Sequence, residues 1–177
     1  MIRPLILGVL MAASLGATAE PLPNRPVPAL DLVRYAGTWH EIAHLPLFFQ
    51  RQCLDTITAT YTPREDGTIH VRNACRTAKG MDASDGVARR VDASSGALKV
   101  RFAPGWLAWL PMVWADYWVI ELDPDYRWAV IGSPSRKYLW VLSREPSMPA
   151  SQFRGIRDRA QARGYPVDRL IMAAPLD

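Results

Sequence analysis

The sequence predicts an all-β fold, an eight-stranded antiparallel up-and-down β-barrel with one C-terminal α-helix packed outside. Short runs rich in β-branched and aromatic residues recur from Gly37 onward, and turn signals separate them. No alternation of strand and helix patterns appears, and a single helical pattern follows the last run. Eight antiparallel strands that close on themselves leave no free sheet edge and enclose space for one small ligand.

The strands follow one another at short intervals along the chain. We expect them at 38–45, 54–62, 68–75, 86–91, 97–102, 116–122, 127–132 and 137–143. Chain reversals are expected at Asp66-Gly67, Ser94-Ser95-Gly96, Asp123-Pro124-Asp125 and Ser133-Pro134-Ser135, because these residue types favour tight turns.

The helix is expected after the last strand. Pro149 suits its first turn, and Gly164 can end it. Phe153, Ile156 and Ala160 share one helical face, whereas the neighbouring charged residues fall mostly elsewhere. We therefore expect this face to pack on the sheet and the basic face to be solvated.

Residues 1–19 have the order of a secretory signal peptide. Arg3 precedes an apolar run, and Ala17-Thr18-Ala19 is an A-x-A cleavage site. The apolar run is too short to span a bilayer, and no later stretch is apolar for about 18 residues. We expect cleavage after Ala19 and a periplasmic or secreted protein without a transmembrane helix.

The remaining chain has the size of one domain. Four prolines in residues 20–30 favour an extended arm with few hydrogen bonds, a tether before the domain of residues 31–177. The net charge of +4 is modest, and basic residues are scattered without aromatic interleaving. A nucleic-acid partner is therefore not expected.

Cys53 and Cys75 are the only cysteines. In an exported chain a disulfide is the default state of such a pair. A hairpin around Asp66-Gly67 would pair positions that sum to about 128–130, and 53 and 75 sum to 128. We expect the two cysteines to be cross-strand neighbours joined by a disulfide; two free thiols are the alternative.

Residues 40–44, His-Glu-Ile-Ala-His, match the H-E-x-x-H pattern of zinc metalloproteases. That chemistry needs a helix, because only helical spacing brings both histidines to one metal. Gly37 and Thr38 are weak helix formers, and Pro46 ends the run. A strand would separate His40 and His44 by roughly 13 Å. We therefore expect a strand, no metal site, and no metalloprotease activity.

Four motifs in order resemble the lipocalins, and most closely the bacterial outer-membrane lipocalins and apolipoprotein D. The resemblance extends from about Asp31 to Ala174. Its motifs are Leu32-x-x-Tyr35-x-Gly37-Thr38-Trp39-x-Glu41-Ile42-Ala43, Asp55-Thr56-Ile57-Thr58-Ala59-Thr60-Tyr61 with Asp66-Gly67, Asp123-Pro124-Asp125-Tyr126, and Tyr138-Leu139-Trp140-Val141-Leu142-Ser143-Arg144.

The resemblance implies structural roles for two residues. Trp39 would plug the closed end of the barrel, and the Arg144 guanidinium would stack on it as a cation–π pair. Many bacterial members carry a lipid on a cysteine directly after the signal peptide, whereas Ala17 is followed here by Thr18. A covalent lipid anchor is therefore not expected.

With Trp39 directed inward, strand alternation assigns the cavity side chains. His40, Ile42 and His44 would then point outward. The residues expected to contact a ligand are Ala43, Ile57, Ala59, Tyr61, Ile69, Val71, Leu98, Val100, Phe102, Tyr117, Val119, Ile131, Tyr138 and Trp140, joined by Trp106 and Trp109 from a loop. This apolar and aromatic set is typical of a small-molecule pocket. For any single residue, filling of the core is an equal alternative.

Two functions remain open. The first is binding or transport of a small hydrophobic or amphipathic ligand, such as a fatty acid or lysophospholipid, in envelope lipid storage or repair, without a cofactor. The second is an enzyme acting on a bound lipid or isoprenoid, because Glu41 and Glu121 also take the inward parity. No nucleophile elbow, P-loop or dinucleotide motif supports the enzyme, so we favour the binding protein.

Residues 103–115 connect the fifth and sixth expected strands and are rich in large apolar side chains. Pro104, Gly105 and Pro111 prevent regular structure in this connection. An apolar loop beside the ligand entrance should not simply face water. It would either fold inward as a lid or make transient contact with a membrane surface through its tryptophans. We expect the lid, because the loop has no basic residue.

Overall fold

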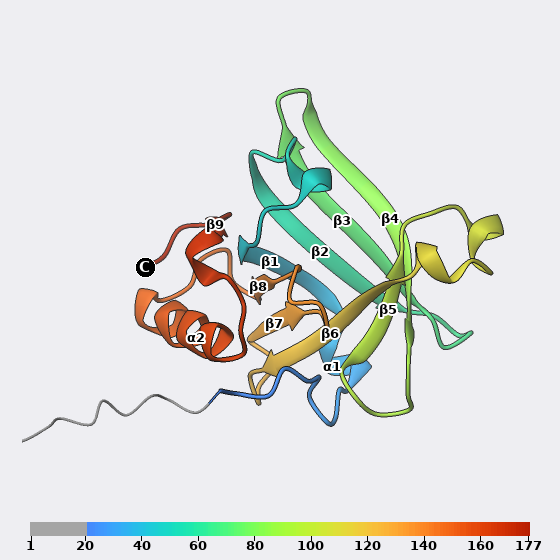
Figure 1. Ribbon diagram of the computed structural model, residues 1–177. Helices are drawn as coiled ribbons and strands as arrows, with labels where there is room; N and C mark the ends of the chain where they lie inside the picture. Colours follow the sequence, from blue (N-terminus) through green and yellow to red (C-terminus); the bar gives the residue numbers. More distant parts are fainter. Residues whose placement is uncertain (1–20) are drawn as a thin grey trace, which may run out of the picture.

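The computed structural model describes residues 21–177, and the expected signal peptide lies outside the described residues. Eight antiparallel strands close into a barrel, and one long helix packs against its outer surface (Figure 1). The predicted fold class is therefore confirmed. Among the described residues, no helix is both long and apolar enough to cross a membrane.

The strands agree with the predicted order. They are β1 (Gly37–His44), β2 (Asp55–Pro63), β3 (Ile69–Thr77), β4 (Gly80–Arg90), β5 (Ala97–Arg101), β6 (Ala115–Leu122), β7 (Trp128–Gly132) and β8 (Trp140–Ser143). Each pairs with the next, and β1 closes the barrel by pairing with both β2 and β8. A short ninth strand, β9 (Ile171–Met172), adds to the outer half of β1 and was not predicted.

Two strand boundaries differ from prediction. β4 begins at Gly80, because residues 80–85 pair with β3 although they bury no apolar face and so show no alternation. β8 begins only at Trp140, because Ser133-Pro134-Ser135 and the residues after it form a longer turn.

Two β-bulges change which side chains enter the barrel. In β1 the extra residue is Ile42, between the pairs Glu41–Leu142 and Ala43–Val141. In β6 it is Ile120, between Val119 and Glu121. Each bulge places two successive residues on the outer face and reverses the inward parity of the residues that follow.

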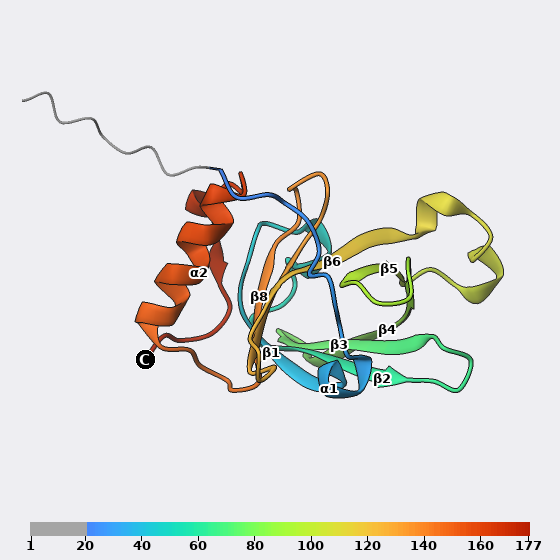
Figure 2. The same cartoon turned by 90° about the horizontal axis from the view of Figure 1, so that it is seen from below.

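The predicted helix is α2 (Ala150–Ala162), with Pro149 at its N-cap. Its buried side chains are the expected Phe153, Ile156 and Ala160, which pack with Ile42, Ala43, Ile120 and Val130 of the barrel's outer face. Figure 2 shows α2 lying along one side of the barrel. Gly164 follows with φ +87°, the left-handed conformation that ends helices.

Short helical turns occupy the connections. They are α1 (Leu32–Tyr35) and the 3-10 helices η1 (Phe48–Gln50), η2 (Gly105–Leu107), η3 (Pro111–Val113) and η4 (Val167–Arg169). α1 lies at the closed end of the barrel, where β1 begins, whereas η1 follows the opposite end of β1 (Figure 1).

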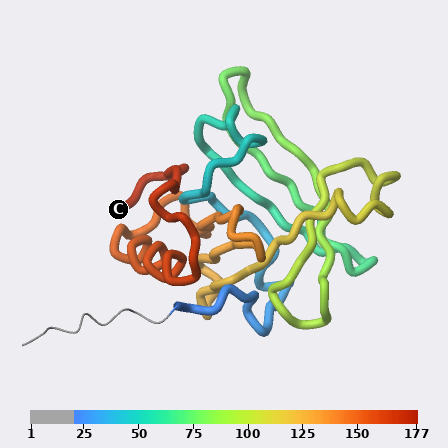
Figure 3. The backbone as a smooth tube through the Cα atoms, viewed as in Figure 1, coloured from blue at the N-terminus to red at the C-terminus, as the bar shows by residue number. Residues whose placement is uncertain are grey.

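The proline-rich segment is bound to the barrel along the part described, residues 21–30. It is extended, as expected, and runs across the barrel surface (Figure 3). Val27 exchanges backbone hydrogen bonds with Val119 and Gly96, and Leu30 is buried in the core. The expectation of a tether with few hydrogen bonds was wrong, because the segment supplies backbone partners beside the β6 bulge.

The closed end is built around Trp39. Its indole is fully buried and donates a hydrogen bond of 2.9 Å to the Tyr35 carbonyl. The Arg144 guanidinium lies 3.8 Å from the centre of the Trp39 ring. The same guanidinium donates hydrogen bonds to the backbone carbonyls of Arg34, Ala36 and Thr38 at 2.8, 2.9 and 2.9 Å. One side chain thus ties α1, β1 and β8 together.

Gly37 is required at this point. Its φ is +92°, and a Cβ there would lie 3.4 Å from Nη1 of Arg144. A side chain would strain the backbone and crowd the guanidinium. Glycine therefore allows the chain to turn from α1 into β1 beneath Arg144.

We predict that Arg144→Ala lowers the free energy of unfolding by about 2–4 kcal/mol, since it removes the cation–π contact and leaves several partly buried carbonyls without a donor. Arg144→Lys should recover only part of this, because an ammonium cannot make the same set of contacts. Urea denaturation measures both. Arg154→Ala, on the exposed face of α2, is the control. An Arg144→Ala variant as stable as this control would contradict the assigned role.

Candidate functional site

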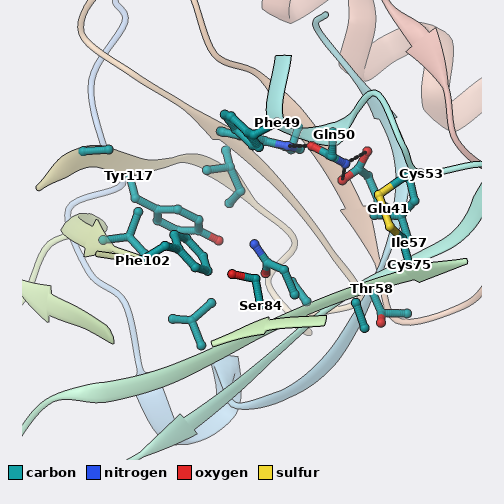
Figure 4. Close-up of a pocket in the computed structure, with 18 of the residues that line it drawn as sticks. Glu41, Phe49, Gln50, Cys53, Ile57, Thr58, Cys75, Ser84, Phe102 and Tyr117 are labelled. Carbon is teal, nitrogen blue, oxygen red and sulfur yellow. Dashed lines mark hydrogen bonds between the residues drawn. A yellow bond between two sulfur atoms is a disulfide. The ribbon is translucent and has the colours of Figure 1, made fainter. Parts of the chain in front are cut away.

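The barrel encloses one large cavity that opens at the end opposite α1. Its volume is about 750 Å³, within the range of small-molecule sites. Phe49 and Gln50 of η1, together with Ala103 and Val113 of the β5–β6 connection, line it near the mouth. Figure 4 shows the cavity with the side chains of Phe49, Gln50 and Phe102 among those that line it.

The structure brings most of the expected ligand residues to this cavity. Those that line it are Ile57, Ala59, Tyr61, Val71, Val100, Phe102, Tyr117, Ile131, Tyr138 and Trp140, and Leu142 joins them. They come from six strands, from the β7–β8 turn and, for Phe102, from the start of the β5–β6 connection. A ligand here would meet a wall that is mainly aliphatic and aromatic.

Three expected residues fill the closed end instead. Ile69, Leu98 and Val119 are buried in the core cluster that also contains Trp39, and they do not line the cavity. The predicted inward direction is thus correct for all three side chains, but the barrel tapers below the cavity and they pack against one another there. These residues therefore fill the core, which was the alternative expected for any single residue.

The expected orientations of Ala43 and His44 were wrong. After the bulge at Ile42, Ala43 packs in the cluster beneath α2. His44 lies opposite Trp140, and its Nε2 is 3.8 Å from Oε1 of Glu41. The bulge adds one residue to β1, so the following side chains exchange faces.

The floor of the cavity carries three tyrosines. The Tyr117 hydroxyl lies 2.7 Å from that of Tyr35 and 2.8 Å from that of Tyr61. Burial raises the pKa of each of the three well above its ordinary value. The floor is therefore a network of neutral hydroxyls that already bond to one another.

Glu41 lies on the cavity wall, as expected from its parity. Its side chain is 6% exposed, and Nε2 of Gln50 donates to both carboxylate oxygens at 3.0 and 2.8 Å. The Trp140 indole in turn donates to Oε1 of Gln50 at 3.3 Å. Figure 4 shows this pair beside the disulfide. Burial raises the pKa of Glu41 to about 7.

Glu121 does not enter the cavity. After the bulge at Ile120 it lies on the outer face, where Nε of Arg159 and Nη1 of Arg163 bond to its two oxygens at 2.6 and 2.9 Å. It therefore fixes α2 to the barrel. The expected inward position of Glu121 was wrong: of the two glutamates, Glu41 lines the cavity and Glu121 does not.

Cys53 and Cys75 form a disulfide, as predicted. The expected hairpin register was wrong, because β2 and β3 pair at positions that sum to 132, as in Tyr61–Val71, and Cys53 precedes β2. Their Cα atoms are 5.5 Å apart, and both residues line the cavity. The bond ties the segment after η1 to β3. It therefore holds η1, and Gln50 with it, over the cavity wall.

The β5–β6 connection does not form the expected lid. It projects away from the barrel (yellow in Figure 1), with Trp106 and Trp109 exposed by 74% and 76%. Neither side chain lines the cavity. Of the three tryptophans of this connection, Trp114 packs back: its indole donates to the Ala108 carbonyl at 2.8 Å, and the Arg89 guanidinium lies 4.2 Å from its ring.

The histidine motif lies on β1, so the strand interpretation is confirmed. In residues 21–177 no group of three or more histidine, cysteine, aspartate and glutamate residues could hold a metal ion.

Several polar lining residues were missed by the sequence analysis. Gln50, Asn73, Asp82 and Ser84 all line the cavity. Asn73 and Ser84 are cross-strand partners, and Asp82 lies opposite Cys75. Inward parity on β3 would have indicated Asn73. No signal predicted Gln50, because η1 lies outside the strands.

Comparisons with known proteins agree with this architecture. The family model of the lipocalin-like domain matches residues 30–175. Temperature-induced lipocalin-1 of Arabidopsis thaliana is 42% identical over 81% of this chain and 78% of its own length. The outer membrane lipoprotein Blc of Escherichia coli is 35% identical over 95% and 94%. Apolipoprotein D of Cavia porcellus is 26% identical over 85% and 80%.

A solved structure shows the same fold. Insecticyanin from the tobacco hornworm Manduca sexta superposes with a TM-score of 0.67 at 20% identity, over 89% of this chain and 87% of its own. A closed barrel with one outer helix is the architecture that the two proteins share. This chain belongs to the lipocalin family, whose members bind small hydrophobic ligands and are generally binding and transport proteins.

Proposed function

We propose that this protein is an exported carrier that binds one single-chain amphiphile, a fatty acid or a lysophospholipid, for envelope lipid storage or repair. The observation that carries the proposal is the cavity of about 750 Å³ with mainly apolar and aromatic walls. Burial of an alkyl chain there would supply the affinity, at about 0.8 kcal/mol for each methylene group.

Export is part of the proposal. The residue pattern of 1–19 supports it, as does the disulfide, because such bonds persist in oxidising compartments. Bacterial relatives bear the name outer membrane lipoprotein, which supports a place in the envelope.

We further propose that the β5–β6 connection makes transient contact with a membrane surface. From Phe102 to Trp114 it has no charged residue, and Met112 at 85% exposure joins the two exposed tryptophans. Tryptophan rings are favoured at the membrane interface. A carrier of insoluble lipids must load and unload there, and this loop lies beside the cavity mouth.

We predict that Ala59→Phe weakens binding of lysophospholipid or fatty acid more than tenfold. The added ring occupies the cavity and excludes about two methylene groups, a loss of ~1.6 kcal/mol. Titration followed by tryptophan fluorescence measures the effect, because Trp140 lines the cavity.

The control is Thr62→Phe, which adds the same ring at an exposed position of the same strand. It should bind like the parent protein. Absence of saturable binding by the parent, or equal affinity of the two variants, would show that the cavity is not the lipid site.

We predict that the triple variant Trp106→Ala, Trp109→Ala and Met112→Ala associates with phosphatidylcholine vesicles at least about tenfold more weakly than the parent, since it loses the exposed apolar groups that would enter the interface. Co-sedimentation measures this association. Val33→Ala, an exposed apolar residue of α1 at the closed end, is the control.

Ligand affinity in solution should be unchanged in the triple variant, because neither tryptophan lines the cavity. Vesicle binding that persists in this variant would argue against membrane contact through the β5–β6 connection. A weakened ligand affinity would instead support the hypothesis that this connection is a lid.

A further inference from the structure

The cavity wall carries acidic side chains and no basic one. Among the described residues that line it are Glu41, Asp82 and Asp116, but no lysine, arginine or histidine. Asp116 has a partner, since Nζ of Lys99 lies 2.8 Å from its Oδ1. Asp82 shares the inward face of Cys75, its partner in the β3–β4 register. The interior therefore favours positive charge over negative charge.

Glu41 is the buried member of this set, and it has no cationic partner. Within residues 21–177 its hydrogen-bond donor is the neutral amide of Gln50. The nearest basic group is His44, whose Nε2 stays 3.8 Å away and whose pKa is lowered by burial. A buried carboxylate without a counter-ion is costly, so a cation brought by a ligand would stabilise it.

Aromatic surfaces line the same cavity as Glu41. The rings of Tyr138 and Trp140 stack with centroids 6.1 Å apart and planes inclined by 9°. Trp140 contacts the same Gln50 amide that holds Glu41, and Phe49 precedes Gln50 in η1. Aromatic faces next to a carboxylate suit the recognition of an ammonium or quaternary ammonium group.

We propose that Glu41, held by Gln50 and flanked by Trp140, is a headgroup site that binds the positively charged nitrogen of an amphiphile. The inference rests on the proposed function and specifies the ligand. Of the two lipid classes, it favours a lysophospholipid with an ammonium headgroup over a free fatty acid. A fatty acid whose carboxylate reached this wall would place a second anion where no cation offsets it.

The site also predicts a pH dependence. Groups that face Glu41 are His44 on β1, the Tyr61 hydroxyl on β2, the Gln50 amide from η1 and the uncharged Trp140 on β8. Burial raises the pKa of Glu41 to about 7, so the carboxylate is mostly protonated at pH 6 and mostly ionised at pH 8. Affinity for a cationic amphiphile should therefore rise about tenfold over this interval, and affinity for an uncharged one should not.

Three probes with the same dodecyl chain test the proposal: dodecyltrimethylammonium, laurate and dodecanol. Calorimetric titration at low salt, below the micelle concentration, gives their affinities. At pH 8 the cation should bind at least about tenfold more tightly than laurate, with dodecanol between them. Glu41→Gln should remove this preference and the pH dependence, whereas Glu65→Gln, an exposed control, should retain both.

Laurate binding as tightly as the cation in the parent, or a preference unchanged in Glu41→Gln, would overturn the headgroup site. If Glu41→Gln does not fold, Asp82→Asn replaces it, because the Asp82 side chain is exposed and has no core contacts. This variant should lower the affinity for dodecyltrimethylammonium by about threefold and leave the affinities for laurate and dodecanol unchanged. An unchanged affinity for the cation would count against the site. Binding of laurate and dodecanol without the cation refutes this inference only. Binding of none of the probes refutes the proposed carrier function as well.

Discussion

The contact between Arg144 and Trp39 closes one end of the barrel, and the rest of the structure depends on that closure. The guanidinium stacks on the indole and donates to carbonyls of α1, of the residue after it and of β1, so it joins the first and last barrel strands. Toward this end the tyrosine network forms the floor of the cavity. Gln50, the disulfide and the apolar loop all lie toward the mouth.

The two β-bulges decide which carboxylate belongs to the cavity. Strand parity alone directs both Glu41 and Glu121 inward, and each glutamate lies next to an inserted isoleucine. In β1 the bulge follows Glu41 and leaves it inside, whereas in β6 it precedes Glu121 and moves it outside to Arg159 and Arg163. One carboxylate therefore fixes the helix, and the other remains in the ligand cavity without a counter-ion.

Much of this arrangement could be predicted from the sequence. The order of the eight strands and the apolar face of α2 follow from alternation and helical spacing, and the disulfide was expected from two cysteines behind a signal-peptide pattern. The hairpin register was not predicted correctly, since β2 and β3 pair two positions away from the expected register. A bulge cannot be predicted in this way, because Ile42 and Ile120 suit a regular strand as well as a bulged one. The outward position of Ala43, the role of Glu121 and the start of β4 depend on pairing between strands, which no single segment reveals. The exposed tryptophans were misassigned because apolarity predicts burial without saying whether protein or lipid covers the side chain.

If Glu41 is a headgroup site, the cavity holds one amphiphile with a positively charged nitrogen. Native mass spectrometry of protein recovered without detergent from its own compartment, with analysis of the extracted lipid, identifies the molecule bound. We expect one adduct for each chain, a single-chain lipid with an ammonium headgroup. A protein that carries only free fatty acid would contradict the role of Glu41. A protein that carries no lipid, and acquires none when lysophospholipid is added, would contradict the carrier itself.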